Sequence, residues 1–74
     1  MKPYQNLNGN STVQAFQIYG DGIKIHFNDD SIYLYLYEKT GKDHVEQMKT
    51  LALEGKGLGS FVDKIGTGSA QKLQ

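Results

Sequence analysis

A glycine-rich segment, Gly55-Lys56-Gly57-Leu58-Gly59-Ser60, has residue types that suit the binding of an anion. Glycine lets the backbone approach a ligand closely, and the free N–H groups at the start of a helix favour negative charge. The spacing of a Walker phosphate loop is absent, so two interpretations remain open. Either Lys56, Gly57, Leu58, Gly59 and Ser60 bind a phosphate, or the segment only connects two helices, with Gly55 ending one and Ser60 beginning the next.

Tyrosines at alternate positions, Tyr33, Tyr35 and Tyr37, form a second candidate site. Alternation places them on one face of a strand, where we also expect Tyr19 and His26. Tyrosine combines a large apolar ring with a polar hydroxyl, which suits interfaces and ring stacking. Three uses remain open: an oligomer interface through Tyr19, Tyr33, Tyr35 and Tyr37, ligand stacking by Tyr33, Tyr35 and His26, or a half-wet strand face without a partner.

No residue pattern indicates catalysis or a bound metal. His26 and His44 fall on different predicted elements, and Asp29-Asp30 is better explained by a turn than by general acid–base chemistry. The chain contains no cysteine, which excludes disulfides and thiolate metal ligands. We therefore expect a protein that is not an enzyme and that uses no metal and no cofactor.

Length and charge narrow the class of protein further. The 74 residues include eight lysines, no arginine and eight acidic residues, for a formal net charge of zero. This predicts one small domain and argues against a nucleic acid as the partner, since phosphate neutralisation needs several cations. The longest apolar run, residues 32–37, is too short to cross a bilayer. The expectation is a soluble, cytoplasmic protein without a membrane partner.

Alternation of apolar and polar residues predicts three antiparallel strands between residues 12 and 37. The turns are Gly20-Asp21-Gly22, with positive φ values, and Asn28–Ser31. A loop of even length at Asn28–Ser31 would pair Ile25 with Leu34. That register places every aliphatic side chain against the helices and every tyrosine on the opposite face. An odd loop would exchange the two sets. We expect the even register, because it separates the aliphatic side chains from the tyrosines.

Helical periodicity follows the strands. An apolar stripe formed by Val45, Met48, Leu51 and Ala52 predicts a helix. We expect it to begin at Asp43, paired with Glu46, and to end at Gly55. A second capping pair, Ser60 and Asp63, predicts a short helix that continues to Ile65.

The predicted fold class is α+β: a three-stranded antiparallel β-meander followed by one α-helix and a short second helix, both packed on one sheet face. Residues 11–65 are expected to form the domain. Residues 1–10 should be a loose lead-in, and residues 66–74 a flexible tail.

Several short motifs occur together along the chain: Ser11-Thr12-Val13, Tyr19, an apolar alternation ending at Phe27, Tyr33 with Tyr35, Leu51-Ala52, and Gly55-x-Gly57-Leu58-Gly59-Ser60-Phe61-Val62. In these residues the chain resembles the KTSC domain, a small family named for the C-terminus of some lysyl-tRNA synthetases. It departs from the family at Asp30, where glycine is usual, and it lacks a proline at the helix start and a tyrosine after the second helix. The resemblance implies a βββα-type module, often standing alone in phage and bacterial genomes, and it implies no established activity.

Together these features favour a non-enzymatic, homo-oligomeric binding module for a phosphate-bearing, nucleotide-type ligand. Tyrosines would stack on the base, and the glycine-rich segment would hold the phosphate. For a phage protein, sequestering a nucleotide signal of host defence is a purpose consistent with the size and the family context. Two alternatives remain open: a protein-binding inhibitor or adaptor that uses the tyrosine face, and an RNA-binding appendage.

Overall fold

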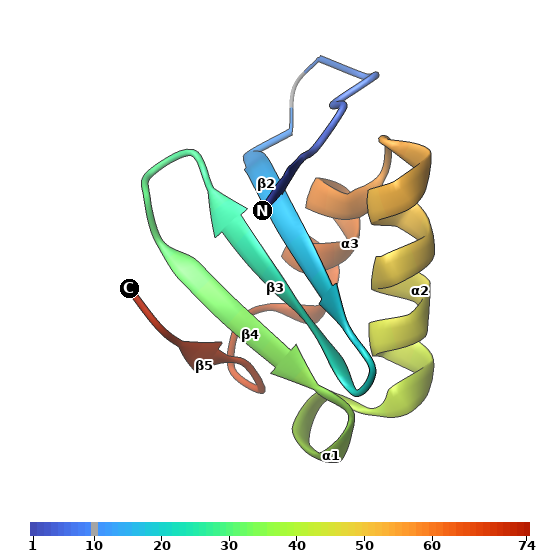
Figure 1. Cartoon of the computed structure of the whole chain (residues 1–74), viewed down its shortest axis with the longest axis vertical. Helices are drawn as coiled ribbons and strands as arrows, with labels where there is room; N and C mark the ends of the chain where they lie inside the picture. Colours follow the sequence, from blue (N-terminus) through green and yellow to red (C-terminus); the bar gives the residue numbers. More distant parts are fainter. Residues whose placement is uncertain (10) are drawn as a thin grey trace.

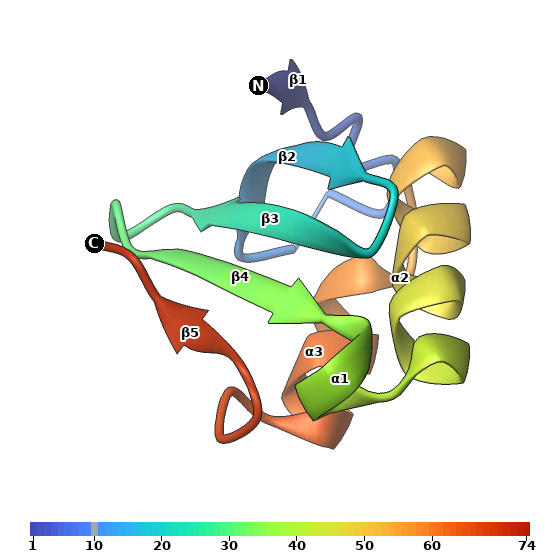
Figure 2. The ribbon, with the colours of Figure 1, turned by 60° about the horizontal axis from the view of Figure 1, so that its bottom comes forward.

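The computed structural model describes residues 1–9 and 11–74. Five antiparallel strands form one sheet in chain order. The elements are β1 (Lys2–Pro3), β2 (Val13–Tyr19), β3 (Gly22–Phe27), β4 (Ile32–Leu36), α1 (Tyr37–Thr40), α2 (Lys42–Glu54), α3 (Leu58–Ile65) and β5 (Gln71–Lys72). Figures 1 and 2 show α2 and α3 together on one side of the sheet. The predicted α+β class is confirmed, and the single turn of α1 and the terminal strands add to it.

The pairing of β3 with β4 differs from the predicted register. Ile25 lies opposite Tyr33, and Ile23 lies opposite Tyr35. The predicted pair of Ile25 with Leu34 is therefore wrong by one residue. Because side chains alternate along a strand, this one-residue difference exchanges the two faces of β4.

The loop between β3 and β4 explains the difference. The N–H of Asp30 donates to the carbonyl of Phe27 (3.0 Å), and the N–H of Phe27 donates to the carbonyl of Ser31 (2.9 Å). Asp30 has a φ of 69°, in the left-handed region. A turn followed by one left-handed residue is the usual geometry of a three-residue hairpin loop. The loop is therefore odd in length.

The core consequently contains tyrosine where aliphatic side chains were expected. The side chain of Tyr35 is fully buried, and its hydroxyl donates to the carbonyl of Gly66 (3.4 Å). Burial raises the pKa of Tyr35 to about 12. The buried apolar residues are Tyr4, Val13, Phe16, Ile23, Ile25, Phe27, Tyr35, Val45, Met48, Ala52, Leu58 and Val62. Leu34 and Leu36, expected in this core, alternate with Tyr35 and lie on the opposite face of the sheet.

The turn between β2 and β3 also differs from the prediction. Gly20 and Gly22 are absent from the residues with positive φ, so the predicted left-handed glycines are wrong. Glycine is required at position 22 for another reason, because the backbone of β4 lies close to it. A Cβ atom at this position would lie 2.5 Å from the carbonyl oxygen of Tyr35.

Glycines, and not side-chain caps, mark the boundaries of α2 and α3. Gly55 ends α2 in the left-handed conformation (φ 80°), as predicted. Helix α2 begins after Gly41, and the predicted N-cap Asp43 lies inside its first turn without a capping hydrogen bond. Helix α3 begins after Gly57, which lies before the predicted cap Ser60. Both predicted side-chain caps are therefore wrong.

Both ends of the chain contact the sheet, in contrast to the predicted loose lead-in and flexible tail. Lys2 pairs with Phe16, and Tyr4 is only 6% exposed. At the other end, Lys72 pairs with Tyr33. Asn10, the last residue of the predicted lead-in, lies outside the described residues. None of the helices that the structure describes is both long and apolar enough to cross a membrane.

Candidate functional site

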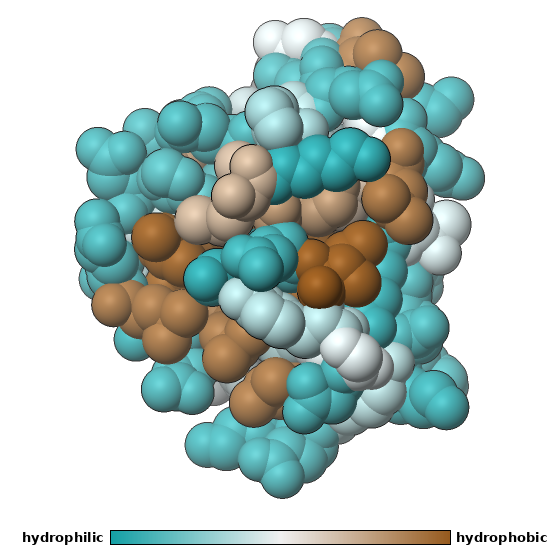
Figure 3. Space-filling model, viewed as in Figure 1, coloured by the Kyte–Doolittle hydropathy of each residue, from teal (hydrophilic) through white to brown (hydrophobic). Residues whose placement is uncertain are grey.

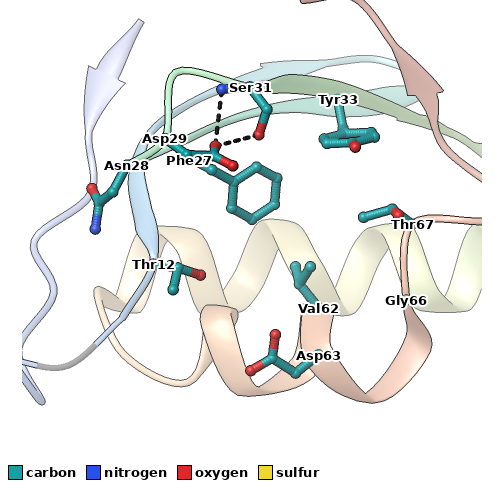
Figure 4. A pocket seen from close by; sticks show the side chains of 10 residues that line it. All are labelled: Thr12, Phe27, Asn28, Asp29, Ser31, Tyr33, Val62, Asp63, Gly66 and Thr67. Carbon is teal, nitrogen blue, oxygen red and sulfur yellow. Dashed lines mark hydrogen bonds between the residues drawn. The ribbon is translucent and has the colours of Figure 1, made fainter.

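Two adjoining cavities lie between α3 and the loops at one end of the sheet. The larger has a volume of about 510 Å³ and is lined by Thr12, Phe27, Asn28, Asp29, Ser31, Tyr33, Val62, Asp63, Gly66 and Thr67 (Figure 4). The smaller has a volume of about 190 Å³ and is lined by Tyr4, Asn6, Asn8, Ser11, Thr12, Gly57, Gly59, Ser60 and Asp63. Thr12 and Asp63 line both cavities. We call the combined depression the α3 groove.

One end of the α3 groove is aromatic. The rings of Phe27 and Tyr33 are 5.8 Å apart between centroids and meet edge to face at 77°. Phe27 is 9% exposed and belongs to the core, whereas Tyr33 is half-buried at the edge of the core. In Figure 4, Val62 of α3 points toward Phe27 from the opposite wall. This end offers apolar contact surface to a flat ring.

The other end of the groove contains the start of α3. The N–H of Leu58 donates to the hydroxyl of Tyr4 (3.1 Å), and the N–H of Phe61 donates to the carbonyl of Gly57 (3.1 Å). Between them, the N–H groups of Gly59 and Ser60 have no acceptor among residues 1–9 and 11–74. Free N–H groups in the first turn of a helix carry partial positive charge and attract anions.

Two carboxylates line the groove. Asp29 Oδ1 accepts hydrogen bonds from the hydroxyl (2.6 Å) and the N–H (3.0 Å) of Ser31, and these bonds hold the pKa of Asp29 below its usual value. Asp63 lies on α3, where the two cavities meet. No lysine or histidine is among the lining residues within the described chain. The lining of the groove is therefore acidic, and positive potential reaches it from the N-terminus of α3 and from Lys72, whose charge helps to lower the pKa of Asp29.

The structure brings together only part of the predicted ligand site. Gly57, Gly59 and Ser60 line the smaller cavity, and Tyr33 lines the larger. Lys56, by contrast, is exposed and lines neither. Leu58, predicted as a ligand contact, has a fully buried side chain, and its N–H is bonded to Tyr4. Neither its side chain nor its N–H therefore faces the groove.

The other two predicted ligand contacts lie elsewhere. Tyr35 is enclosed in the core, so its predicted stacking role is wrong. His26 alternates with the core residues Ile25 and Phe27 and lies on the opposite face of β3. There its Nε2 atom is 3.4 Å from Asp30 Oδ1. Neither residue belongs to the α3 groove.

The four tyrosines of the predicted interface lie in different places in the structure. Tyr19 lies beneath the Lys24 ammonium, which is 5.8 Å from its ring centroid. Tyr37 begins α1, and its hydroxyl donates to Glu46 of α2. Tyr33 and Tyr35 face the helices. The four tyrosines therefore do not share a surface.

The sheet face opposite the helices is instead aliphatic. Leu34, Leu36 and Leu73 line a shallow hollow of about 210 Å³ together with Tyr19, Asp21 and Lys24. Leu73 is 45% exposed, and the two β4 leucines are half-buried. Figure 3 shows apolar side chains gathered over β4 and β5 on this face. We call it the outer sheet face.

Sequence reasoning missed several residues of the α3 groove. Asp63 was interpreted as a cap, although three residues after Ser60 on a helix it necessarily shares a surface with Ser60. Phe27 was predicted only as core. The contact of Tyr4 with Leu58 spans 54 residues and has no local signal. No group of three His, Asp or Glu side chains within the described part of the chain could hold a metal ion.

Comparison of the chain with protein-family models, with curated proteins and with solved structures found no match. A functional proposal therefore depends on the α3 groove and the outer sheet face themselves.

Proposed function

We propose that the α3 groove binds a nucleoside monophosphate. The observation that carries this proposal is the order of chemical groups along the groove. Aromatic rings lie at one end, and Thr12 and Asp63 lie at the junction of the cavities. At the other end lie the N–H groups of Gly59 and Ser60, which have no acceptor among the residues that the structure describes. This order corresponds to base, ribose and phosphate.

Each part of such a ligand meets a suitable partner. A base would pack against Tyr33 and the edge of Phe27, as flat rings do on aromatic side chains. The carboxylate of Asp63 would accept hydrogen bonds from ribose hydroxyls, since an ionised carboxylate is an acceptor only. The phosphate would bind to the first turn of α3, where its charge is favoured.

Charge favours one phosphate over several. The groove has two carboxylates and no basic side chain among its described lining residues. Each additional phosphate would add negative charge close to Asp63 without a compensating cation. We therefore expect monophosphates to bind more tightly than the corresponding triphosphates.

The proposed role is binding without chemical conversion, in a small module of the KTSC type. Holding a nucleotide in this way would suit a phage protein that sequesters a signal used in host defence. A protein-binding adaptor and an RNA-binding appendage are the competing functions. Both predict that isolated nucleotides fail to bind in the groove.

Calorimetric titration with the four common ribonucleoside 5′-monophosphates tests the proposal. Ser60→Asp places a carboxylate at the expected phosphate position, while an acidic residue in the first turn stabilises a helix. We expect this variant to bind at least about tenfold more weakly than wild type, a loss of ~1.4 kcal/mol, without a loss of folding stability.

Lys56→Ala is the matched control, because it makes the same change in net charge at a position outside the groove. Its affinity should remain within about threefold of wild type, since an exposed lysine contributes only a screened charge. Absence of binding to wild type, or equal affinities of wild type and folded Ser60→Asp, would refute the proposed site.

We also propose that the chain self-associates through the outer sheet face. The supporting observation is the aliphatic hollow formed by Leu34, Leu36 and Leu73, with Lys24 and Asp21 at the same surface. A second copy related by a two-fold axis could pair these opposite charges while it covers the leucines.

A further inference from the structure

A hydrogen-bond acceptor lies beside the aromatic rings of the α3 groove. Asp29 lines the same cavity as Phe27 and Tyr33. A base held against these rings would therefore present its edge to a carboxylate. No lysine or arginine is among the described residues that line the groove, so the charged side chain beside the base is the Asp29 carboxylate.

The carboxylate of Asp29 is held in one orientation. Its Oδ1 atom accepts from both the N–H and the hydroxyl of Ser31, as the dashed lines in Figure 4 show. These bonds occupy the donors of Ser31, so Ser31 reinforces Asp29 as an acceptor. Oδ2 accepts neither of these two hydrogen bonds.

Nucleobases differ in what they present to such an acceptor. Guanine carries two adjacent donors, N1–H and the exocyclic N2 amine. Adenine and cytosine place a ring-nitrogen acceptor beside their single amine, and uracil flanks its one N–H with two carbonyl oxygens. A carboxylate accepts from two adjacent donors but repels a neighbouring lone pair.

We infer that the nucleotide bound in the α3 groove is a guanine nucleotide, whose N1–H and N2 amine donate to Oδ2 of Asp29, the carboxylate oxygen that Ser31 leaves free. This inference rests on the proposed nucleotide site and names its base. Asp29 would act as the specificity-determining residue, and Asp63 would contact the ribose without reading the base.

Titration with the 5′-monophosphates of guanosine, inosine, adenosine, cytidine and uridine tests the inference. Inosine monophosphate differs from guanosine monophosphate only by the missing N2 amine. We expect the guanine compound to bind about 10- to 100-fold more tightly than the adenine, cytosine and uracil compounds, with the hypoxanthine compound between them.

Two variants locate the discriminating group. Asp29→Asn retains an oxygen acceptor for Ser31, so the loop should keep its conformation, but it replaces one carboxylate oxygen by a donor. This variant should lose most of the guanine preference. Asp63→Asn should change the affinities for all five compounds by a similar factor and leave the preference intact.

The outcomes separate the two proposals. If none of the five compounds binds, the nucleotide site itself is refuted. If they bind with similar affinities, the groove is a nucleotide site without guanine specificity, and the inference is wrong. A guanine preference that survives in Asp29→Asn, or that disappears in Asp63→Asn, would also overturn the assignment to Asp29.

Discussion

Asp30 occupies the left-handed position of the loop between β3 and β4, with a φ of 69°. A left-handed conformation costs an ordinary L-residue roughly 1–2 kcal/mol, less for Asp, and nothing for glycine. We expect Asp30→Gly to remain within about 0.5 kcal/mol of wild type, because the relief of strain is offset by the flexibility of glycine in the unfolded chain.

Asp30→Val should lower the free energy of unfolding by ~1–2 kcal/mol, because a β-branched residue resists positive φ. Urea denaturation of the two variants measures the difference. Equal stability of the valine and glycine variants would mean that position 30 is not left-handed and that the odd register is wrong.

Substitutions at Tyr35 and Leu34, which lie on opposite faces of β4, test the same register. Tyr35 is fully buried, whereas Leu34 lies on the outer sheet face. Tyr35→Ala should cost ~3–5 kcal/mol in unfolding free energy, and Leu34→Ala no more than about 1 kcal/mol. Denaturation should be followed at a concentration at which wild type is monomeric. The reverse ranking would restore the even register.

The chemistry of tyrosine explains why the register was predicted incorrectly. Separating aliphatic from aromatic side chains assumed that three tyrosines could not be buried. Tyr35 is buried because its hydroxyl reaches the carbonyl of Gly66, which lies 31 residues away and gives no signal near β4. A local signal did exist at Asp30. Aspartate adopts positive φ more readily than most residues other than glycine.

At the scale of the elements, α1 and α2 are joined by one polar cluster. The hydroxyl of Tyr37 donates to Glu46, and the Lys49 ammonium is 2.9 Å from Glu46 Oε2 and 3.2 Å from the Tyr37 hydroxyl. The hydrogen bonds from Tyr37 and Lys49 hold the pKa of Glu46 below its usual value. The ionised form is therefore favoured in the folded state.

This lowered pKa predicts how stability depends on pH. Its contribution is present above the unfolded pKa and is lost as the pH falls through the folded pKa. The difference in unfolding free energy between wild type and Glu46→Gln should be constant near neutral pH and should shrink steadily as acidification passes below the unfolded pKa of a glutamate. A difference that persists undiminished at roughly pH 3 would show that ionised Glu46 contributes nothing through this cluster.

The sequence predicted an element correctly where its apolar residues were periodic or where a single glycine marked its end. The stripe of Val45, Met48 and Ala52 is buried as predicted, and Gly55 ends α2. The start of α3 was not predictable from neighbouring residues, because it depends on Gly57 and on the hydroxyl of Tyr4. For that reason the glycine-rich segment could be named from the sequence as a candidate site, whereas the residues that line the α3 groove beside it could not.

At the scale of the whole molecule, the two sides of the sheet have different proposed uses. Helices and the α3 groove occupy one side, and the outer sheet face presents leucines on the other. We expect wild type to be larger than one chain at micromolar concentration in light scattering coupled to size exclusion. Leu36→Asp should shift it to a monomer, because a charge would be buried without a partner.

A monomeric wild type would refute self-association and leave the α3 groove unaffected, since no residue of that groove lies in the hollow of the outer sheet face. Thr50→Asp is a suitable control, because position 50 is exposed on α2 and lies outside that hollow. Its oligomeric state should equal that of wild type.

If one groove along α3 holds a nucleotide from base to phosphate, both ends of that groove must respond to the same ligand. Nuclear magnetic resonance of the isotope-labelled chain, titrated with guanosine 5′-monophosphate, measures this directly. We expect the amide signals of Gly59 and Ser60 and the ring signals of Tyr33 to shift together with one dissociation constant, while those of Tyr19 and Leu34 on the outer sheet face stay unchanged. Shifts confined to the outer sheet face, or no shifts at either end of the α3 groove, would contradict it.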